Sequence, residues 1–558
     1  MVSLSKNLTS VGVLGAPASP RPHPRSIGHR LRYALFALAL SLSFGAQRVS
    51  AADLCSDLFS LESIKVVDNP LFTYLNKNPS LEQVQVGIKP LQTGALGLAA
   101  KLSLIARAQK TIDLSYYIFR PDTSGYAVLD ALKSAMARGV SVRFIVDGAG
   151  TFSAGNAHFD SLVDFNKTLF VSRLEVKVVN PIASVRKTIS KIISLFYSGK
   201  WLFAPSDINR RSHDKILLVD AGTTSSWAVL GGRNIGDEYY GVGSAIGAEF
   251  IDYEILVKGG SMSGSADPLE TVMKYYNILF EHELSLVLTG TSQGDETHLT
   301  RMSEAKEGLR RDVEFEKQMD LTRQSAFWSD GFDSTTTTLV SEIQNLVKKL
   351  RLSFDTKQWV TLSTNPNITR SFFEIAKEAH SSIVIVSPYV MFAKKDIEFM
   401  REWLIRNPQA VFSIYTNSYS TADSMLTMAI FQNLTLPRLR ALQKDPKIGD
   451  RLRIFQYKGE TLLHVKAIII DDSATLVTTS NFDARSRLLN SEIGMWMASA
   501  LNLKALKNLI FQVEAQSEHL SLQSLANARP QNLREQLRLR ILAHLTRIFE
   551  ITHLDLLF

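Results

Sequence analysis

The chain has 558 residues, of which 45% are hydrophobic and 21% are charged, a composition that excludes a disordered or fibrous protein. Its formal net charge of +8 comes from 62 Lys and Arg against 54 Asp and Glu. Residues 1–51 contain six of these bases and no acid, so the remainder has 56 bases against 54 acids and a net charge of +2. A charge this small argues against a groove for nucleic acid.

The N-terminal segment has the three parts of a secretory signal. An Arg-containing stretch ends at Arg32, an apolar run of 14 residues spans positions 33–46, and small residues follow at Val49 and Ala51. The run is shorter than the roughly 20 residues of a membrane-spanning helix. We therefore expect residues 1–51 to be a signal peptide, and the protein to be exported: periplasmic, peripheral to the membrane, or secreted.

Beyond this segment, one pattern of helix and strand occurs twice. Apolar residues at helical spacing precede a strand-like run within residues 102–119 and again within residues 127–148. The counterparts in the second half are residues 372–390 and 396–417. Helix alternating with strand predicts an α/β fold built around a mostly parallel sheet.

Each half then contains the same short signature, H-x-K-x-x-x-x-D. It comprises His213, Lys215 and Asp220 in the first half. It recurs as His464, Lys466 and Asp471 in the second half, and these six residues are the candidate catalytic set. Eleven histidines would give roughly 0.03 accidental matches, so two matches within a repeat exclude chance.

A strand, a small-residue turn and an Asn follow each signature. Asn234 comes 14 residues after the first Asp and Asn481 comes 10 residues after the second. The Lys ammonium and the Asn amide are hydrogen-bond donors suited to phosphate oxygens. We expect both asparagines to bind the phosphate of a substrate.

The period of a β-strand places the His and Lys of each signature on one face. Asp220 and Asp471 lie at an odd offset from their histidines, beyond an apolar run. A regular strand would direct them to the opposite face, so we interpret them as structural partners within the signature rather than as chemical groups.

Two histidines that converge on one phosphorus permit a two-step phosphoryl exchange. One imidazole attacks to form a phosphohistidine, and the other protonates the departing alcohol and deprotonates the incoming one. Each ring needs a carboxylate to orient it. Asp252 and Glu492 occupy comparable positions at the start of a following strand and are the candidates.

These residues resemble the phospholipase D superfamily, in which the H-x-K-x4-D signature occurs twice in a bilobal chain. The sequences NRRSHDKILLVD, GGRNIGDEYYG, YTNSYSTADS and SNFDARSRLLNSEIG are similar to the bacterial cardiolipin synthase branch. The resemblance covers residues 95–500 and implies two α/β/α lobes packed face to face with one active site between them. It also implies that His213 is the nucleophile and His464 the acid and base.

The second half departs from the family pattern at Thr478 and Thr479, where the family usually has Gly-Ser. Thr479 keeps the hydroxyl, so we include it among the phosphate-binding candidates.

The signal-like segment, the resemblance and the remaining segments together suggest a division of the chain into six parts. They are a signal peptide (1–51), an N-terminal extension (52–94), a first lobe (95–260), a connecting region (261–365), a second lobe (366–500) and C-terminal helices (501–558).

The leading hypothesis is a phosphatidyltransferase or phospholipase D that acts on phosphatidylglycerol or a similar phospholipid at a membrane surface, close to cardiolipin synthases. An exported hydrolytic phospholipase D is the alternative, because water and an alcohol would use the same acid and base. A nuclease and a non-enzymatic lipid-binding protein are the weaker alternatives. We expect no cofactor, no catalytic metal, since the remaining histidines lack paired ligand spacing, and no nucleic-acid partner; the oligomeric state stays open.

Overall fold

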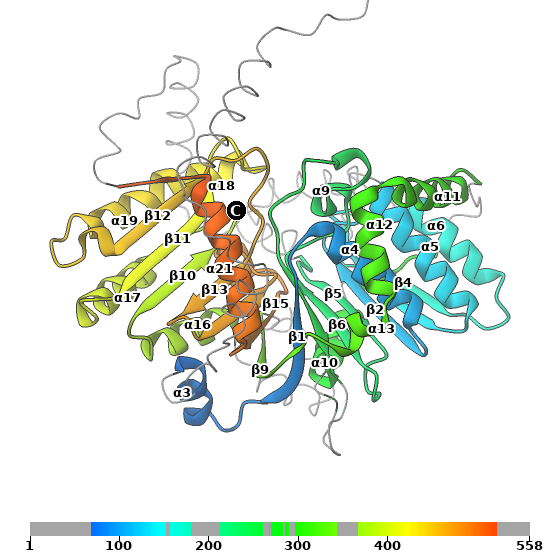
Figure 1. The fold of residues 1–558 in the computed structure, drawn as a ribbon, viewed down its shortest axis with the longest axis horizontal. Coiled ribbons are helices and arrows are strands. Elements are labelled where there is room, and N and C mark those ends of the chain that lie inside the picture. The colour runs from blue at the N-terminus through cyan, green and yellow to red at the C-terminus, as the bar shows by residue number, and fades with distance from the viewer. Residues whose placement is uncertain are drawn as a thin grey trace, which may run out of the picture. The chain divides into compact units, whose positions relative to one another are not determined.

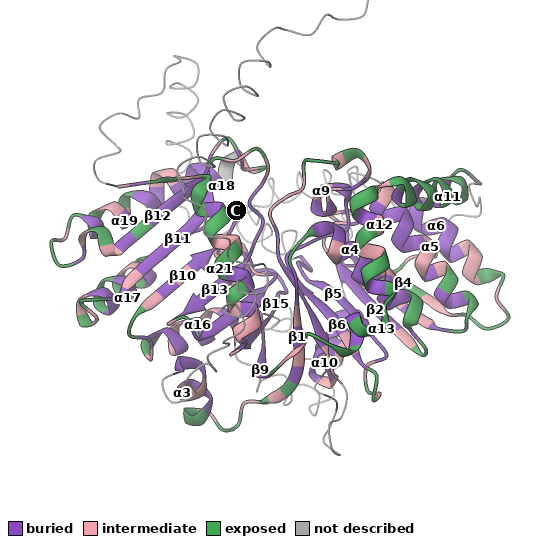
Figure 2. Cartoon of the chain, in the orientation of Figure 1, coloured by how far each residue is buried: buried purple, intermediate pink, exposed green. Residues whose placement is uncertain are grey.

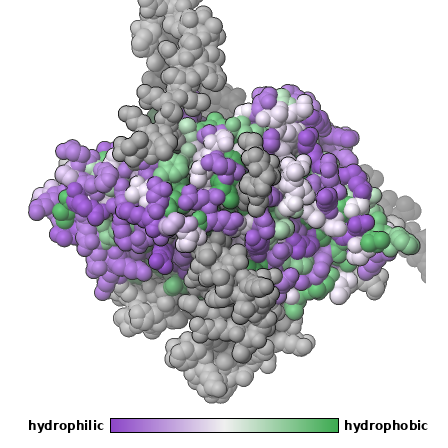
Figure 3. All heavy atoms as spheres, turned by 90° about the horizontal axis from the view of Figure 1, so that it is seen from below, coloured by the Kyte–Doolittle hydropathy of each residue, from purple (hydrophilic) through white to green (hydrophobic). Residues whose placement is uncertain are grey.

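The structure is a computed structural model that describes residues 69–151, 157–179, 211–259, 267, 269–282, 285–289, 296–342 and 367–521 (Figure 1). The expected signal peptide, residues 1–51, lies outside the described residues, as do parts of the expected extension, connecting region and C-terminal helices. No described helix combines the length and apolar character needed to cross a membrane. The face drawn in Figure 3 is mainly hydrophilic, with hydrophobic residues in small groups.

Sixteen strands form one sheet in which two sets of eight follow the same order. From one edge inward, the first set is β8 (Ser285–Val287), β4 (Leu174–Val179), β3 (Ser141–Asp147), β2 (Thr111–Tyr116), β5 (Lys215–Val219), β6 (Trp227–Gly231), β7 (Glu254–Lys258) and β1 (Val84–Leu91). From the other edge, the second set is β16 (Ser517–His519), β12 (Leu452–Tyr457), β11 (Val411–Asn417), β10 (Ser382–Val386), β13 (Ala467–Ile470), β14 (Ala474–Thr478), β15 (Ile493–Met497) and β9 (Asp333–Ser341). The repeated order confirms two similar α/β halves, which meet where β1 pairs antiparallel with β9.

The expectation of a mostly parallel sheet is wrong. Four pairings are parallel: β2 with β3, β3 with β4, β10 with β11, and β11 with β12. Helices connect these strands, whereas each strand that carries a signature is joined to the next strand by a hairpin without a helix. β5 and β13 therefore pair antiparallel with both of their neighbours.

Helices cover both halves of the sheet. In the first half they are α4 (Gly94–Arg107), α5 (Thr123–Ala137), α6 (Ala157–Lys167), α9 (Asp237–Tyr240), α10 (Glu270–Phe280), α11 (Glu296–Arg311), α12 (Val313–Arg323) and α13 (Ser325–Ser329). In the second half they are α3 (Pro70–Lys77), α16 (Ile368–Lys377), α17 (Lys394–Arg406), α18 (Met425–Ile430), α19 (Leu436–Gln443), α20 (Ala484–Leu488) and α21 (Ala500–Ala515). Side-chain caps begin several of them: Asp122 accepts a hydrogen bond from the Gly125 N–H at α5, and Asn367 accepts one from the Arg370 N–H at α16.

Elements outside the expected lobe ranges also belong to this architecture. β1 comes from the expected extension, and β9 comes from the expected connecting region. Helices α10 to α13 also fall within that connecting region.

The strands of the sheet are largely buried (Figure 2). Buried side chains form three large clusters. One lies under α4, α5, α6, α11 and α12, and another lies under α16, α17 and α19. The third contains residues from strands of both halves together with α10 and α21. This shared cluster fixes the two halves against each other, because removing its apolar surface from water stabilises their contact.

A buried ion-pair network supports the start of β7. The Lys101 ammonium on α4 lies 2.6 Å from the Glu254 carboxylate, and both side chains are 1% exposed. Arg233 lies 3.7 Å from the same carboxylate and donates a hydrogen bond to the backbone oxygen of Asp252 at 2.8 Å. Burial lowers the pKa of Lys101, and Glu254 opposes that effect.

We expect Lys101→Met to lower the free energy of unfolding by about 3 kcal/mol, because it leaves the buried Glu254 carboxylate without its closest countercharge. Urea unfolding of the full chain measures the loss. The matched control is Lys77→Met, which removes a Lys that is 60% exposed in its pair with Glu378 and should cost less than about 1 kcal/mol. Equal losses for the two variants would contradict the role of the buried pair.

Candidate active site

Backbone hydrogen bonds between the two halves bring the signature histidines to one place. The His213 N–H donates to the Ser491 oxygen at 3.1 Å, and the His464 N–H donates to the Ile251 oxygen at 2.7 Å. Single parallel bridges flank both contacts. In each case the receiving residue immediately precedes a carboxylate, so each histidine is held beside an acid from the opposite half.

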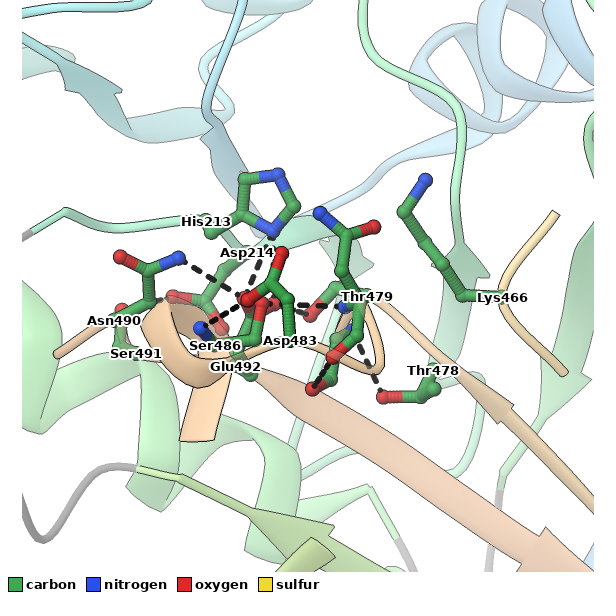
Figure 4. Close-up of polar contacts among 12 residues, drawn as sticks. His213, Asp214, Lys466, Thr478, Thr479, Asp483, Ser486, Asn490, Ser491 and Glu492 are labelled. Carbon is green, nitrogen blue, oxygen red and sulfur yellow. Dashed lines mark hydrogen bonds and ion pairs between the residues drawn. The ribbon is translucent and has the colours of Figure 1, made fainter. Parts of the chain in front are cut away.

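The carboxylates contact the histidines in an exchanged pattern. His213 Nδ1 lies 2.9 Å from Glu492 Oε1 (Figure 4), and His464 Nδ1 lies 2.5 Å from Asp252 Oδ2. The sequence predicted both acids as partners of the histidines, and the structure brings all four residues together. An Nδ1–H that donates to a carboxylate leaves the lone pair on Nε2 for chemistry.

The two lysines share one contact, and Lys466 adds a second, because its Nζ also lies 2.9 Å from His464 Nδ1. Each Nζ donates a hydrogen bond of 2.6 Å to the backbone oxygen of its own signature histidine. Burial lowers the pKa of Lys215 to about 7, opposed by Glu492, and lowers the pKa of Lys466 to about 8, opposed by Asp252. A bound anion would favour the charged form of both groups.

Burial also sets the charge of the histidines. It lowers the pKa of His213 well below its ordinary value, and Lys215 and Lys466 act in the same direction. Burial and Lys466 lower the pKa of His464, while Asp252 opposes them. Near neutral pH both rings are therefore neutral before an anion binds.

Glu492 has further hydrogen-bond donors around it. Thr479 Oγ1 donates to Glu492 Oε2 at 2.6 Å, and Asn490 Nδ2 donates to Oε1 at 3.3 Å (Figure 4). Burial raises the pKa of Glu492 well above its ordinary value, and Lys215 and Thr479 oppose that rise. The Thr479 side chain is fully buried, and its hydroxyl holds the Glu492 carboxylate. Binding of substrate phosphate by Thr479 stays a prediction.

The Thr-Thr departure is accommodated by a compensating glycine. In the first half, the counterpart of Thr478 is Gly231, which pairs with Glu254, and a Cβ on Gly231 would lie 2.7 Å from the Glu254 Cα, so only glycine fits there. In the second half, Thr478 lies opposite Gly494, where a Cβ would approach Thr478 Cβ to 2.9 Å. Each half therefore has one glycine in this pair of facing residues: it lies on β6 in the first half and on β15 in the second half.

The two asparagines are not equivalent. Asn234 Oδ1 accepts the Ile118 N–H at 3.1 Å, and Asn234 Nδ2 donates to Tyr239 Oη at 3.0 Å. Asn481 Oδ1 is buried and has no hydrogen-bond partner among the described residues. Only the second asparagine presents an unused amide atom.

Asp220 and Asp471 lie at the opposite ends of β5 and β13 from the lysines of the two signatures. Asp220 accepts the backbone N–H groups of residues 109–111 at 2.7 to 3.0 Å, and Asp471 accepts those of residues 380–382 at 2.7 to 2.8 Å. Both adopt a left-handed backbone, with φ of 52° and 50°. The structure does not bring them to the histidines, so their place in the candidate catalytic set is corrected: they tie the end of each signature strand to the start of its neighbour.

The sequence interpretation missed Asp214, which lies between His213 and Lys215. Its buried carboxylate accepts the Tyr275 hydroxyl at 2.6 Å, the Ser212 hydroxyl at 3.2 Å and the Ser491 hydroxyl. It therefore helps to tie the segment that carries Glu492, just before β15, to the first half. One sequence feature could have indicated this role: Asp214 is charged, whereas Val465 stands at the same position of the second signature.

Two aromatic rings contact the histidines. The ring of Tyr117 meets His213 edge-on with centroids 4.9 Å apart, and the ring of Tyr239 meets His464 edge-on at 5.2 Å. Within the part of the chain that the structure describes, no group of three or more His, Cys, Asp or Glu side chains is placed to hold a metal ion.

We expect Asp471→Asn to lower the free energy of unfolding by about 1–3 kcal/mol, because the amide cannot accept all of the backbone donors that the carboxylate accepts. Chemical denaturation measures the loss. The adjacent Asp472, which is exposed and pairs with Lys507 at 2.9 Å, provides the control Asp472→Asn, whose effect should be within about 0.5 kcal/mol of zero. A stable Asp471→Asn protein would contradict the structural role.

Comparison with known proteins agrees with this geometry. A family model described as the PLD-like domain of cardiolipin synthase matches residues 102–242. Cardiolipin synthase C of Escherichia coli (strain K12) is 25% identical over 425 residues, which cover 74% of this chain and 82% of that protein. A protein of Helicobacter pylori (strain ATCC 700392 / 26695) named only as uncharacterized is 25% identical over 440 residues, 77% of this chain and 80% of that protein.

A solved structure has the same fold. The crystal structure of phosphatidylserine synthase from Haemophilus influenzae Rd KW20 matches with a TM-score of 0.55 and 14% sequence identity. The match covers 87% of this chain and 98% of that chain, so it extends over both halves.

Proposed function

Because the chain belongs to the phospholipase D superfamily, near its cardiolipin synthase branch, we propose that it is a phosphatidyltransferase that works through a phosphohistidine. The observation that carries the proposal is the exchanged pairing of His213 with Glu492 and of His464 with Asp252. Each ring is thereby fixed in the tautomer that leaves Nε2 available, and each has a lysine beside it.

In the first step, His213 Nε2 attacks the phosphorus of a phospholipid. The new P–N bond forms as the bond between phosphorus and the head-group oxygen breaks, and protonated His464 gives its proton to that departing oxygen. His464 is neutral in the free protein, but a bound phosphodiester adds a negative charge that raises the pKa of the ring. Asp252 stabilises the resulting imidazolium.

In the second step, the hydroxyl of an acceptor attacks the same phosphorus. His464 takes the hydroxyl proton, and the P–N bond to His213 breaks, which restores the free enzyme. Lys215 and Lys466 neutralise the charge of the non-bridging oxygens throughout, and the Nδ2 amide of Asn481 donates a hydrogen bond to one of them. No residue in this scheme requires a metal or a cofactor.

The substrate class follows from the relatives and is part of the proposal. Relatives named cardiolipin synthases suggest that the donor is phosphatidylglycerol or a similar phospholipid and that the acceptor is a phospholipid alcohol at a membrane surface. The alternative is an exported phospholipase D in which water is the acceptor. The signal-like residues 1–51 suggest that the enzyme acts outside the cytoplasm.

The decisive experiment is to incubate the purified full-length protein with phosphatidylglycerol vesicles in the presence of EDTA and to resolve the lipids by mass spectrometry. We expect cardiolipin and glycerol, and we expect His213→Ala to lower their formation at least about 1,000-fold because it removes the nucleophile. The control is His380→Ala, which removes an exposed histidine beside Asp471, at the opposite end of β13 from His464. Phosphatidic acid as the sole product would instead identify a hydrolytic phospholipase D.

The pH dependence gives a second test. Asp252 raises the pKa of His464, so Asp252→Asn should lower that pKa and reduce the fraction of protonated ring. The high-pH limb of kcat/KM should therefore move to lower pH, and activity at pH 7 should fall by about 100-fold. An unchanged or raised limb would contradict the assignment of His464 as the acid.

A further inference from the structure

The hydrogen bonds around Asn234 have only one consistent direction. The backbone N–H of Ile118 can only donate, so the atom of Asn234 that meets it is the amide oxygen. The amide nitrogen therefore faces Tyr239 Oη at 3.0 Å, and because this nitrogen can only donate, the phenol oxygen is the acceptor. The proton of the Tyr239 hydroxyl remains available for another acceptor.

Tyr239 lies where the chemistry of the second histidine takes place. Its ring meets the His464 ring edge-on with centroids 5.2 Å apart, and Phe250 supports it from another side at 5.2 Å. The residue is 3% exposed. Its position is further fixed by the Arg233 guanidinium, which donates to the Tyr239 backbone oxygen at 3.2 Å.

The phenol keeps its proton across the physiological pH range. Burial raises the pKa of Tyr239 far above its ordinary value, and the nearby carboxylates of Glu238, Asp252 and Asp423 act in the same direction, while the hydrogen bond from Asn234 opposes them. Asp423 also raises the pKa of Lys466 and of Tyr117. A buried hydroxyl that keeps its proton is a hydrogen-bond donor rather than a base.

We propose that Tyr239 is a further catalytic residue: oriented by Asn234, its hydroxyl donates a hydrogen bond to a non-bridging oxygen of the reacting phosphodiester beside His464. The inference rests on the proposed phosphatidyl transfer. It also assigns Asn234 a new role, since this amide acts on the substrate through the tyrosine, whereas Asn481 contacts it directly. The hydrogen bond strengthens as negative charge accumulates on the phosphoryl oxygens, so it acts on kcat more than on KM.

The chain supplies a matched pair of variants. Tyr239→Phe removes one hydroxyl and keeps the ring that packs on His464. Tyr240→Phe removes the hydroxyl of the adjacent residue, which is buried without a hydrogen-bond partner among the described residues. With phosphatidylglycerol vesicles as substrate, we expect Tyr239→Phe to lower kcat by about 100-fold with little change in KM, and Tyr240→Phe to retain the wild-type value within about twofold.

A double-mutant cycle tests the link to Asn234. If the amide acts through the tyrosine, then Asn234→Ala combined with Tyr239→Phe should lose no more activity than the more impaired single variant. Losses that multiply would overturn the relay. A kcat for Tyr239→Phe within about twofold of wild type would overturn the whole inference.

The outcomes also separate this inference from the proposed function. A wild-type protein that turns over no phospholipid overturns the proposed function and the inference with it, whereas an active wild type with an equally active Tyr239→Phe overturns the inference alone. If Tyr239→Phe unfolds in thermal melting, incorporation of 3-fluorotyrosine at position 239 changes the acidity of the phenol without removing a contact. We then expect an altered kcat, and an unaltered kcat would overturn the inference.

Discussion

The exchange of carboxylates between the two halves is the constraint on which the site depends. Neither half contains a complete histidine and acid pair, because His213 contacts Glu492 and His464 contacts Asp252. The same segments also exchange backbone hydrogen bonds, so the peptide that precedes each acid is fixed to the peptide that carries the opposite histidine. A displacement of the halves would break both pairs together, which makes the shared hydrophobic cluster between them a requirement for chemistry as well as for stability.

The internal symmetry is close in the backbone and broken in the side chains. The two sets of strands follow one order, and both lysines bind the carbonyl of their own histidine. In contrast, Gly232 leaves room for Asp252, whereas Thr479 supplies a hydroxyl to Glu492. These differences allow two histidines on similar scaffolds to have different environments, as a nucleophile and a proton carrier require.

Much of the site could be predicted from sequence because its residues recur at fixed spacing in strands. The repeated signature identified His213 and His464. The strand period placed the lysines on the face of the histidines and indicated that Asp220 and Asp471 are structural, and the structure places both aspartates away from the histidines. The mostly parallel sheet was wrong because the helix and strand alternation stops before each signature strand. The role of Thr479 and the contacts of Asp214 and Tyr239 depend on partners distant in sequence, which no local pattern specifies.

The electrostatics of the site explain why it suits a phosphodiester. Two lysines and two histidines are removed from water with only part of their charge balanced, and burial lowers the pKa of all four groups. An incoming phosphate would reverse this effect, since its negative charge favours protonated lysines and a protonated His464. In the proposed reaction, the bound phosphodiester thus generates the protonated His464 and the two charged lysines that the transfer needs. In the absence of substrate His213 stays neutral, and so it remains nucleophilic.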